Sequence, residues 1–166
     1  SEGRDAEETR ELLSRYFDVS RSIIERYGGT VEKFIGDAVM AQWGAPIGEP
    51  DDPDRALAAA IDMQRALVRL NDQWRLDRRP ELAMGIGINY GEAFAGNIGS
   101  ERRLEYTVIG DTVNTASRLC SAAKGGEIVI SDSLRTALHS TPALEEGIPL
   151  ELKGKSQPVP SYRVQW

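Results

Sequence analysis

The sequence predicts an α+β fold in which helices cover a mostly antiparallel sheet. Strand-like runs alternate with helical runs along the chain, and two of the strand-like runs flank a tight-turn dipeptide. At 166 residues the chain is long enough for one sizeable hydrophobic core, and no shift in composition divides it. We therefore expect a single domain over residues 1–166.

The first element is a helix followed by a hairpin. Apolar residues at helical spacing run up to Gly28-Gly29, a pair that ends a helix as a carboxyl-terminal cap does. They are Leu12, Leu13, Tyr16, Phe17, Ile23, Ile24 and Tyr27. Residues 31–35 and 38–43 are strand-like and flank Gly36-Asp37, which suits a hairpin turn.

A second long helix comes next, followed by a strand whose two faces differ in side-chain size. The helix is expected to take Asp52 as its cap and Pro53 as its first residue, and to end near residues 74–77. In residues 82–88 bulky side chains alternate with small ones, so one face of that strand is bulky and the other is nearly bare. A bare face lets a helix or a ligand approach closely.

The last third supplies the remaining elements. We expect a strand that leads into a helix beginning near residues 111–112, then a strand at 127–130, a short helix at 132–138 and two strands within 149–166. This order predicts a ferredoxin-like α/β sandwich. Such a hairpin normally has a central strand before its helix. Either that strand lies upstream of the residues given, or the sheet is built differently; the first alternative is preferred, so the domain is expected to be incomplete at its amino terminus.

Composition excludes several function classes. A net charge of −6 and a pI near 4.9 argue against a nucleic-acid surface. His139 is the single histidine and Cys120 the single cysteine, which leaves little material for Ser-His or multi-histidine zinc chemistry. Cys120 is expected to be a buried thiol. No segment is apolar enough to span a bilayer and the amino terminus is not signal-like, so a cytoplasmic domain is expected.

The most informative segment is residues 104–119, a strand followed directly by a helix. Asn114 and Arg118 are four residues apart and lie on adjacent turns of one helical face, an arrangement that suits a phosphate ester. The apolar residues Val113, Ala116, Cys120 and Ala123 can dock the same helix on a core. In isolation such an Asn and Arg more often belong to a solvated face, so other motifs must support the functional interpretation.

Three ordered motifs supply that support. They are Phe34-Ile35-Gly36-Asp37-Ala38, Gly85-Ile86-Gly87-Ile88-Asn89-Tyr90-Gly91 and the segment 106–118. Together they resemble the catalytic domain of class III adenylyl and guanylyl cyclases, along the whole chain. The resemblance implies active sites at a dimer interface, two metal ions on the triphosphate, and attack of the ribose 3′-hydroxyl on the α-phosphate with release of pyrophosphate.

The resemblance assigns roles to individual residues. Asp37 matches one of two metal-binding aspartates, and the strand that carries the other aspartate is absent from the residues given. Asn114 matches the residue that positions the ribose, and Arg118 the residue that stabilises the pentavalent phosphorus. Lys153 matches the lysine that neutralises the terminal phosphates, with Lys155 as the alternative. The metals implied are two Mg²⁺ or Mn²⁺ ions.

The base-reading positions favour ATP. Lys33 matches a lysine of adenylyl cyclases, where guanylyl cyclases tend to carry Glu. Thr107 stands where many adenylyl cyclases have Asp, and its hydroxyl can accept the same hydrogen bond from adenine. Its neighbour Val108 is also expected to contact the substrate. Thr at this place resembles the class IIIb subgroup, some members of which respond to bicarbonate.

The leading hypothesis is a homodimeric adenylyl cyclase domain, because one chain carries both the metal-side and the substrate-side residues. A guanylyl cyclase is the enzymatic alternative. A diguanylate cyclase is disfavoured because its acidic hairpin signature is not matched by residues 35–38. A non-catalytic dimerisation or nucleotide-sensing module that kept the fold is the alternative from another class.

Overall fold

The computed structural model describes most of the chain. The described residues are 2–35, 38–44, 48–91, 94–100, 103–109, 111–151 and 157–166. Within them the helices are α1 (Glu2–Arg26), α2 (Asp52–Leu76), α3 (Asp111–Ala122) and α4 (Asp132–Ala137). The strands are β1 (Thr30–Ile35), β2 (Ala38–Gln42), β3 (Ile86–Ile88), β4 (Phe94–Ser100), β5 (Arg103–Ile109), β6 (Ile128–Ser131), β7 (Leu144–Glu146) and β8 (Ser161–Val164).

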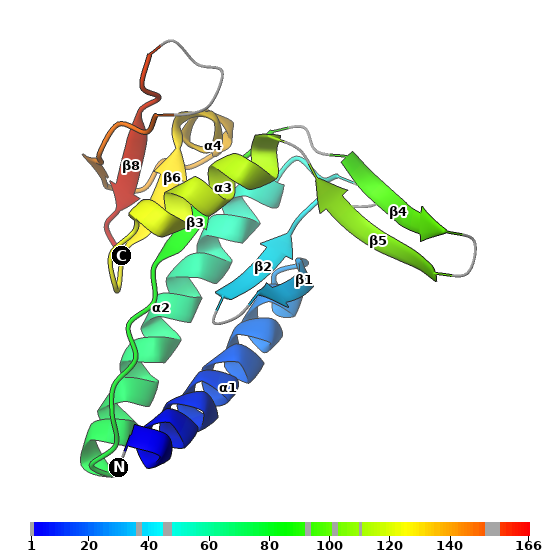
Figure 1. The fold of residues 1–166 in the computed structure, drawn as a ribbon. Helices are drawn as coiled ribbons and strands as arrows, with labels where there is room; N and C mark the ends of the chain where they lie inside the picture. The colour runs from blue at the N-terminus through cyan, green and yellow to red at the C-terminus, as the bar shows by residue number, and fades with distance from the viewer. Residues whose placement is uncertain are drawn as a thin grey trace.

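Strand pairing in the described part of the chain is mostly antiparallel, as expected. A four-stranded sheet has the order β3-β6-β8-β7, in which the β3–β6 pair alone is parallel. The hairpins β1–β2 and β4–β5 form two further two-stranded sheets. Figure 1 shows the β4–β5 hairpin projecting from the body beyond the start of α3. The α+β prediction is therefore confirmed, with a mixed sheet at its centre.

The four-stranded sheet separates α2 from α3, and the alternation in β3 explains why. Ile86 and Ile88 pack against a core cluster that includes residues of α2, β6 and α4. Successive side chains of a strand point to opposite faces, so the glycines at 85 and 87 face the other way, toward α3. Figure 1 shows α3 lying across β3 and β6. The bulky and bare faces predicted from the sequence are thus the two faces of this sandwich.

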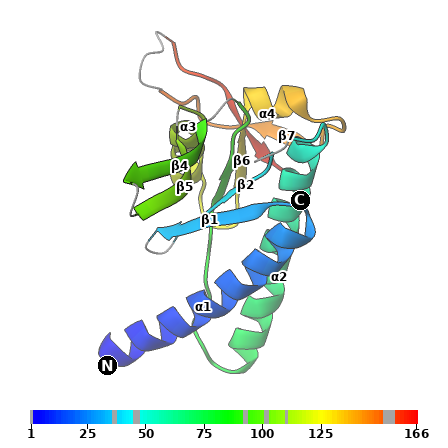
Figure 2. The ribbon, with the colours of Figure 1, turned by 90° about the vertical axis from the view of Figure 1, so that its right-hand side faces the viewer.

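The helices α1 and α2 pack antiparallel. Leu12 and Tyr16 of α1 are buried against Leu67 and Trp74 in the carboxyl-terminal part of α2. Near the hairpin, Tyr27 donates its hydroxyl proton to Asp62 of α2 at 2.5 Å. Figure 2 shows α1 reaching the body at its carboxyl end while its amino end lies far from the sheet. The β1–β2 hairpin therefore starts from the end of α1 that is packed on α2.

Two helices end in the same backbone motif with different residues. After α1, the Gly29 amide donates to the Ile24 carbonyl at 2.9 Å and Gly28 has a φ of 86°. After α2, the Arg79 amide donates to the Trp74 carbonyl at 2.8 Å, and Arg78 takes the left-handed conformation with a φ of 57°. This conformation favours glycine, so the predicted end of α1 is confirmed, whereas α2 ends at the expected place with an unexpected residue.

The start of α2 corrects the sequence prediction. Asp51, not Asp52, precedes the helix as its cap residue, and Asp52 is its first residue. The carboxylate of Asp52 accepts from the Glu49 amide at 2.7 Å and from the Arg55 guanidinium at 2.5 Å. Asp52 therefore fastens the preceding loop to the helix instead of capping it.

Several strands also differ from the expectation. Residues 82–85 are extended but unpaired with a strand, because the side chains of Asn71 and Gln64 bind the backbone there, leaving β3 only three residues long. Of the two closing strands expected within 149–166, the described residues show β8 and a bridge between Leu150 and Val159. Strands β4 and β7 were not predicted.

Candidate functional site

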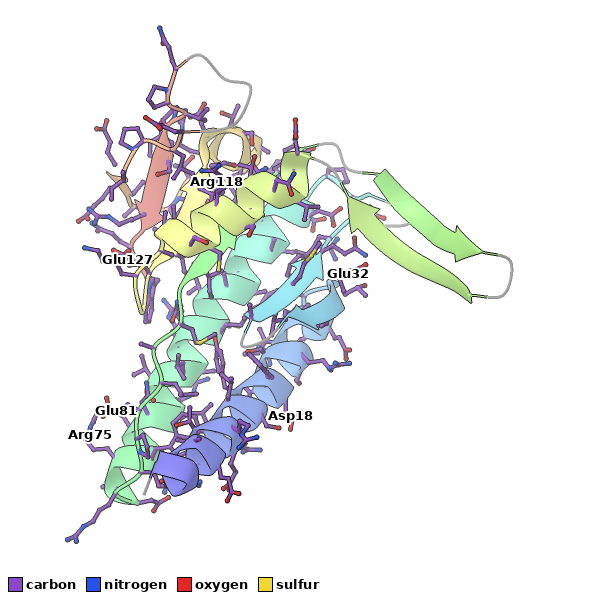
Figure 3. The ribbon with its side chains drawn as sticks, in the orientation of Figure 1. Asp18, Glu32, Arg75, Glu81, Arg118 and Glu127 are labelled. Atoms are coloured by element: carbon purple, nitrogen blue, oxygen red, sulfur yellow. The ribbon has the colours of Figure 1, made fainter. Side chains whose placement is uncertain are left out.

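Helix α3 presents the two predicted catalytic side chains to solvent. Asn114 and Arg118 are both exposed, one turn apart, while Leu119 is fully buried. Figure 3 marks Arg118 on α3. Arg118 makes no ion pair or hydrogen bond to any residue that the structure describes, so its guanidinium is available for an anion. The structure thus brings these two residues together as the sequence predicts.

The backbone of α3 rests directly on the bare face of β3. A Cβ atom added to Gly87 would lie 2.2 Å from the Cys120 nitrogen, 2.6 Å from the Leu119 carbonyl carbon and 2.8 Å from the Ala116 oxygen. These are all backbone atoms of the helix. No side chain fits between strand and helix at this point, so the absence of one at Gly87 sets how closely α3 approaches the sheet.

Cys120 contradicts the expectation of a buried thiol. It is exposed, and its sulfur lies 3.6 Å from the Gly85 carbonyl oxygen. The reason is that the Cys120 backbone occupies the contact with Gly87, so the side chain is directed to the edge of the interface. Leu119 takes the buried position instead.

Sequence reasoning gave no role to Asn89, which the structure places between three elements. Its amide nitrogen donates to the Thr112 carbonyl oxygen in the first turn of α3 at 3.0 Å. Its amide oxygen lies 3.0 Å from the Ser133 hydroxyl of α4. The sequence held a signal, because Gly85, Gly87, Asn89 and Gly91 alternate along the segment that contains β3. The one side chain among them, that of Asn89, contacts the helix that carries Arg118.

The remaining predicted substrate residues are only partly described. Thr107 and Val108 lie on β5, paired with Gly96 and Ala95 of β4, shortly before α3 begins. Lys33 lies on β1, paired with Met40, next to an irregularity in the hairpin register. The side chains of these three residues lie outside the described part. Figures 1 and 2 show both hairpins on the same side of α2.

The predicted metal and phosphate ligands fall outside the described residues. Asp37 follows β1 in the sequence and Lys153 precedes β8, and neither is among the described residues. Among the residues whose positions are described, no group of three or more His, Cys, Asp or Glu side chains could hold a metal ion. The described donor set does not by itself form a metal site.

Comparisons with known proteins identify the family. The model of the adenylate and guanylate cyclase catalytic domain matches residues 1–164. The chain belongs to this family. It is 40% identical to adenylate cyclase 1 of Rhizobium meliloti (strain 1021) over 119 residues, which cover 72% of this chain and 18% of that protein. The family is therefore that of the class III nucleotide cyclases.

Solved structures support the same assignment. The guanylyl cyclase Cya2 matches with a TM-score of 0.87 at 38% identity, covering 96% of this chain and 81% of the other. The adenylyl cyclase CyaB from P. aeruginosa matches with a TM-score of 0.84 at 35% identity, covering 94% and 81%. Similar proteins thus include enzymes of both nucleotide specificities.

The chain spans about a fifth to a quarter of the curated relatives it matches, which are longer proteins. In the described part of the chain, none of the helices has the length and apolar character that crossing a bilayer requires.

Proposed function

We propose that the chain is the catalytic domain of an adenylyl cyclase, which converts ATP to 3′,5′-cyclic AMP and pyrophosphate. The observation that carries this proposal is α3, where Asn114 and Arg118 are exposed one turn apart on a helix whose backbone is seated on the sheet. An exposed arginine that pairs with none of the described residues, on a helix seated on the sheet and in a member of this family, is suited to a phosphoryl group in reaction.

The chemistry assigned to α3 is positioning and charge stabilisation. The ribose 3′-hydroxyl gives up its proton to solvent as its oxygen forms a bond to the α-phosphorus, and the bond from that phosphorus to the pyrophosphate oxygen breaks, so that pyrophosphate leaves. Asn114 holds the ribose by hydrogen bonds from its carboxamide, and the Arg118 guanidinium binds the phosphoryl oxygens as their negative charge grows. Arginine suits this task because it stays charged and offers a planar fork of donors. Removing such a donor typically lowers turnover by about 10²–10³-fold.

Metal binding is proposed on the sequence resemblance alone. Asp37 would be one ligand of two divalent ions, and Lys153 would contact the terminal phosphates. Such ions, when bound, neutralise triphosphate charge and polarise the reacting phosphate.

Selectivity for ATP is proposed from Lys33 and Thr107, with Val108 as a further contact to the base. A guanylyl cyclase is the second candidate, and the observation that favours it is the match to Cya2 at a TM-score of 0.87. Lys33 argues for adenine, because the resemblance places Glu there in guanylyl cyclases. Residues 1–166 are proposed to act as one domain in a homodimer, since the chain carries residues for both sides of the site.

The test is turnover of ATP and of GTP with Mn²⁺ by the full-length protein, beside a Lys33→Glu variant. A ratio of kcat/KM that favours ATP at least 10-fold, and that falls at least 10-fold in Lys33→Glu, supports the proposal. A preference for GTP in the unaltered protein replaces it by the guanylyl alternative. No cyclic product from either nucleotide, with a folded dimer, points to the binding module.

A further inference from the structure

The contact between β3 and α3 has an unusual composition. On the strand side three of the four alternate residues that face the helix are glycines, at 85, 87 and 91. Helix packing on a sheet is normally fixed by side chains that interdigitate. A backbone surface lets the helix approach closely but offers few side chains that would stop it from sliding along the strand.

Asn89 is the residue on this face that can fix the position of α3. Its Nδ2 donates to the Thr112 carbonyl oxygen at 3.0 Å. Because a carbonyl oxygen can only accept, the amide nitrogen must face Thr112, and the amide oxygen then faces the hydroxyl of Ser133, whose single proton is shared with the nearer Tyr90 carbonyl oxygen. The half-buried setting protects the hydrogen bond to Thr112 from competing water.

Ser133 anchors Asn89 from the other side. Its hydroxyl oxygen lies 3.0 Å from Asn89 Oδ1, 2.7 Å from the Tyr90 carbonyl oxygen and 3.0 Å from the hydroxyl of Ser131. Ser131 is buried and caps α4, where it accepts from the Leu134 amide at 3.1 Å. The amide of Asn89 is therefore linked through serines to the start of α4, and from there to the core.

We propose that Asn89 is a positioning residue for the site on α3, holding the first turn of the helix so that Asn114 and Arg118 meet the substrate in register. Thr112 is two residues before Asn114, and at about 1.5 Å of rise per residue Arg118 lies only about 9 Å further along the axis. A shift at the first turn is therefore carried to both side chains. This inference rests on the proposed function, since it names how that site is held.

The variant that isolates the effect is Asn89→Asp, because it keeps the size of the side chain and replaces the donor to Thr112 by an acceptor. The chain offers a matched control in Asn71→Asp. The Asn71 amide donates to the Leu82 carbonyl oxygen at 2.8 Å, a contact of the same kind on α2, away from α3. Both variants lose a half-buried hydrogen bond from an amide to a carbonyl oxygen. Only Asn89→Asp loses it at the first turn of α3.

Steady-state kinetics of the full-length protein with ATP and Mn²⁺ give the first readout. We expect kcat to fall at least 10-fold in Asn89→Asp with KM changed less than 3-fold, and kcat of Asn71→Asp to stay within 2-fold of the unaltered protein. In an Arg118→Ala background the same Asn89→Asp change should cost less than 3-fold, because its effect acts through α3. Equal kcat values in the two Asp variants would overturn the proposal.

Amide hydrogen exchange gives a second readout that needs no activity. The first turns of α3 should exchange at least 5-fold faster in Asn89→Asp than in Asn71→Asp. If the unaltered protein makes no cyclic nucleotide, the proposed function fails, while the exchange rates still decide whether Asn89 holds α3. Unchanged exchange in α3 refutes the positioning role whatever the activity.

Discussion

Replacing Gly87 by Ala should displace the helix that carries the site. The added methyl would lie 2.2 Å from the Cys120 nitrogen, and ordinary contact begins at 3.4 Å, so α3 must retreat by about 1.2 Å. The other close atoms, in Leu119 and Ala116, are also backbone and cannot turn aside. A misplacement of about 1 Å can cost about 10²-fold in rate. We expect kcat to fall by about that factor and the free energy of unfolding by about 1–3 kcal/mol.

The assay combines turnover of ATP with urea unfolding, and Gly48→Ala is the control. Among the described residues that are not its chain neighbours, the nearest heavy atom to a Cβ at Gly48 would be the Gly44 carbonyl oxygen at 3.7 Å, so this variant should keep the stability and turnover of the unaltered protein. If Gly87→Ala keeps turnover within 2-fold of the unaltered protein, α3 does not need a glycine at this contact with β3, and the expected displacement is wrong.

Three further predictions concern stability. Leu119→Ala empties the buried position of α3, so the free energy of unfolding measured in urea should fall by about 2–5 kcal/mol. Arg78→Gly removes the conformational strain of a non-glycine residue in the left-handed region at the end of α2. It should raise the free energy of unfolding by about 1 kcal/mol, seen as a higher Tm. Partial burial raises the pKa of Asp54, but hydrogen bonds from His139 outweigh it and hold the pKa below its ordinary value of 3.8. The ionised carboxylate therefore stabilises the fold above that pH, so the Tm difference between the unaltered protein and Asp54→Asn should be present at pH 7 and shrink as the pH falls below about 4.

The sequence was most informative where one local rule decides the structure. The glycine pair after α1 and the alternation in residues 82–88 each predict a feature that the structure confirms. The prediction failed where distant partners decide. Residues 82–85 alternate like a strand, yet Asn71 and Gln64 of α2 bind their backbone. Strand β7 is short and polar, and it exists because β8 pairs with it.

The candidate site divides in the same way. Asn114 and Arg118 follow from their spacing on one helix, so the sequence alone places them together. The alternation in the sequence puts Asn89 on the glycine-rich face, but its role depends on Thr112 and Ser133, which come from elements that only the fold brings to it. The roles of Lys33, Asp37, Thr107, Val108 and Lys153 stay predictions from the resemblance.

We propose above all that Arg118 of α3 stabilises phosphoryl transfer from ATP. The most direct measurement is cyclic AMP formation by the full-length protein with Mn²⁺, compared between Arg118→Ala and Arg65→Ala, which removes an exposed arginine of α2. We predict at least about 10²-fold less product per unit time for Arg118→Ala and unchanged turnover for Arg65→Ala. If Arg118→Ala and Arg65→Ala turn over ATP at the same rate, Arg118 does not stabilise the transfer.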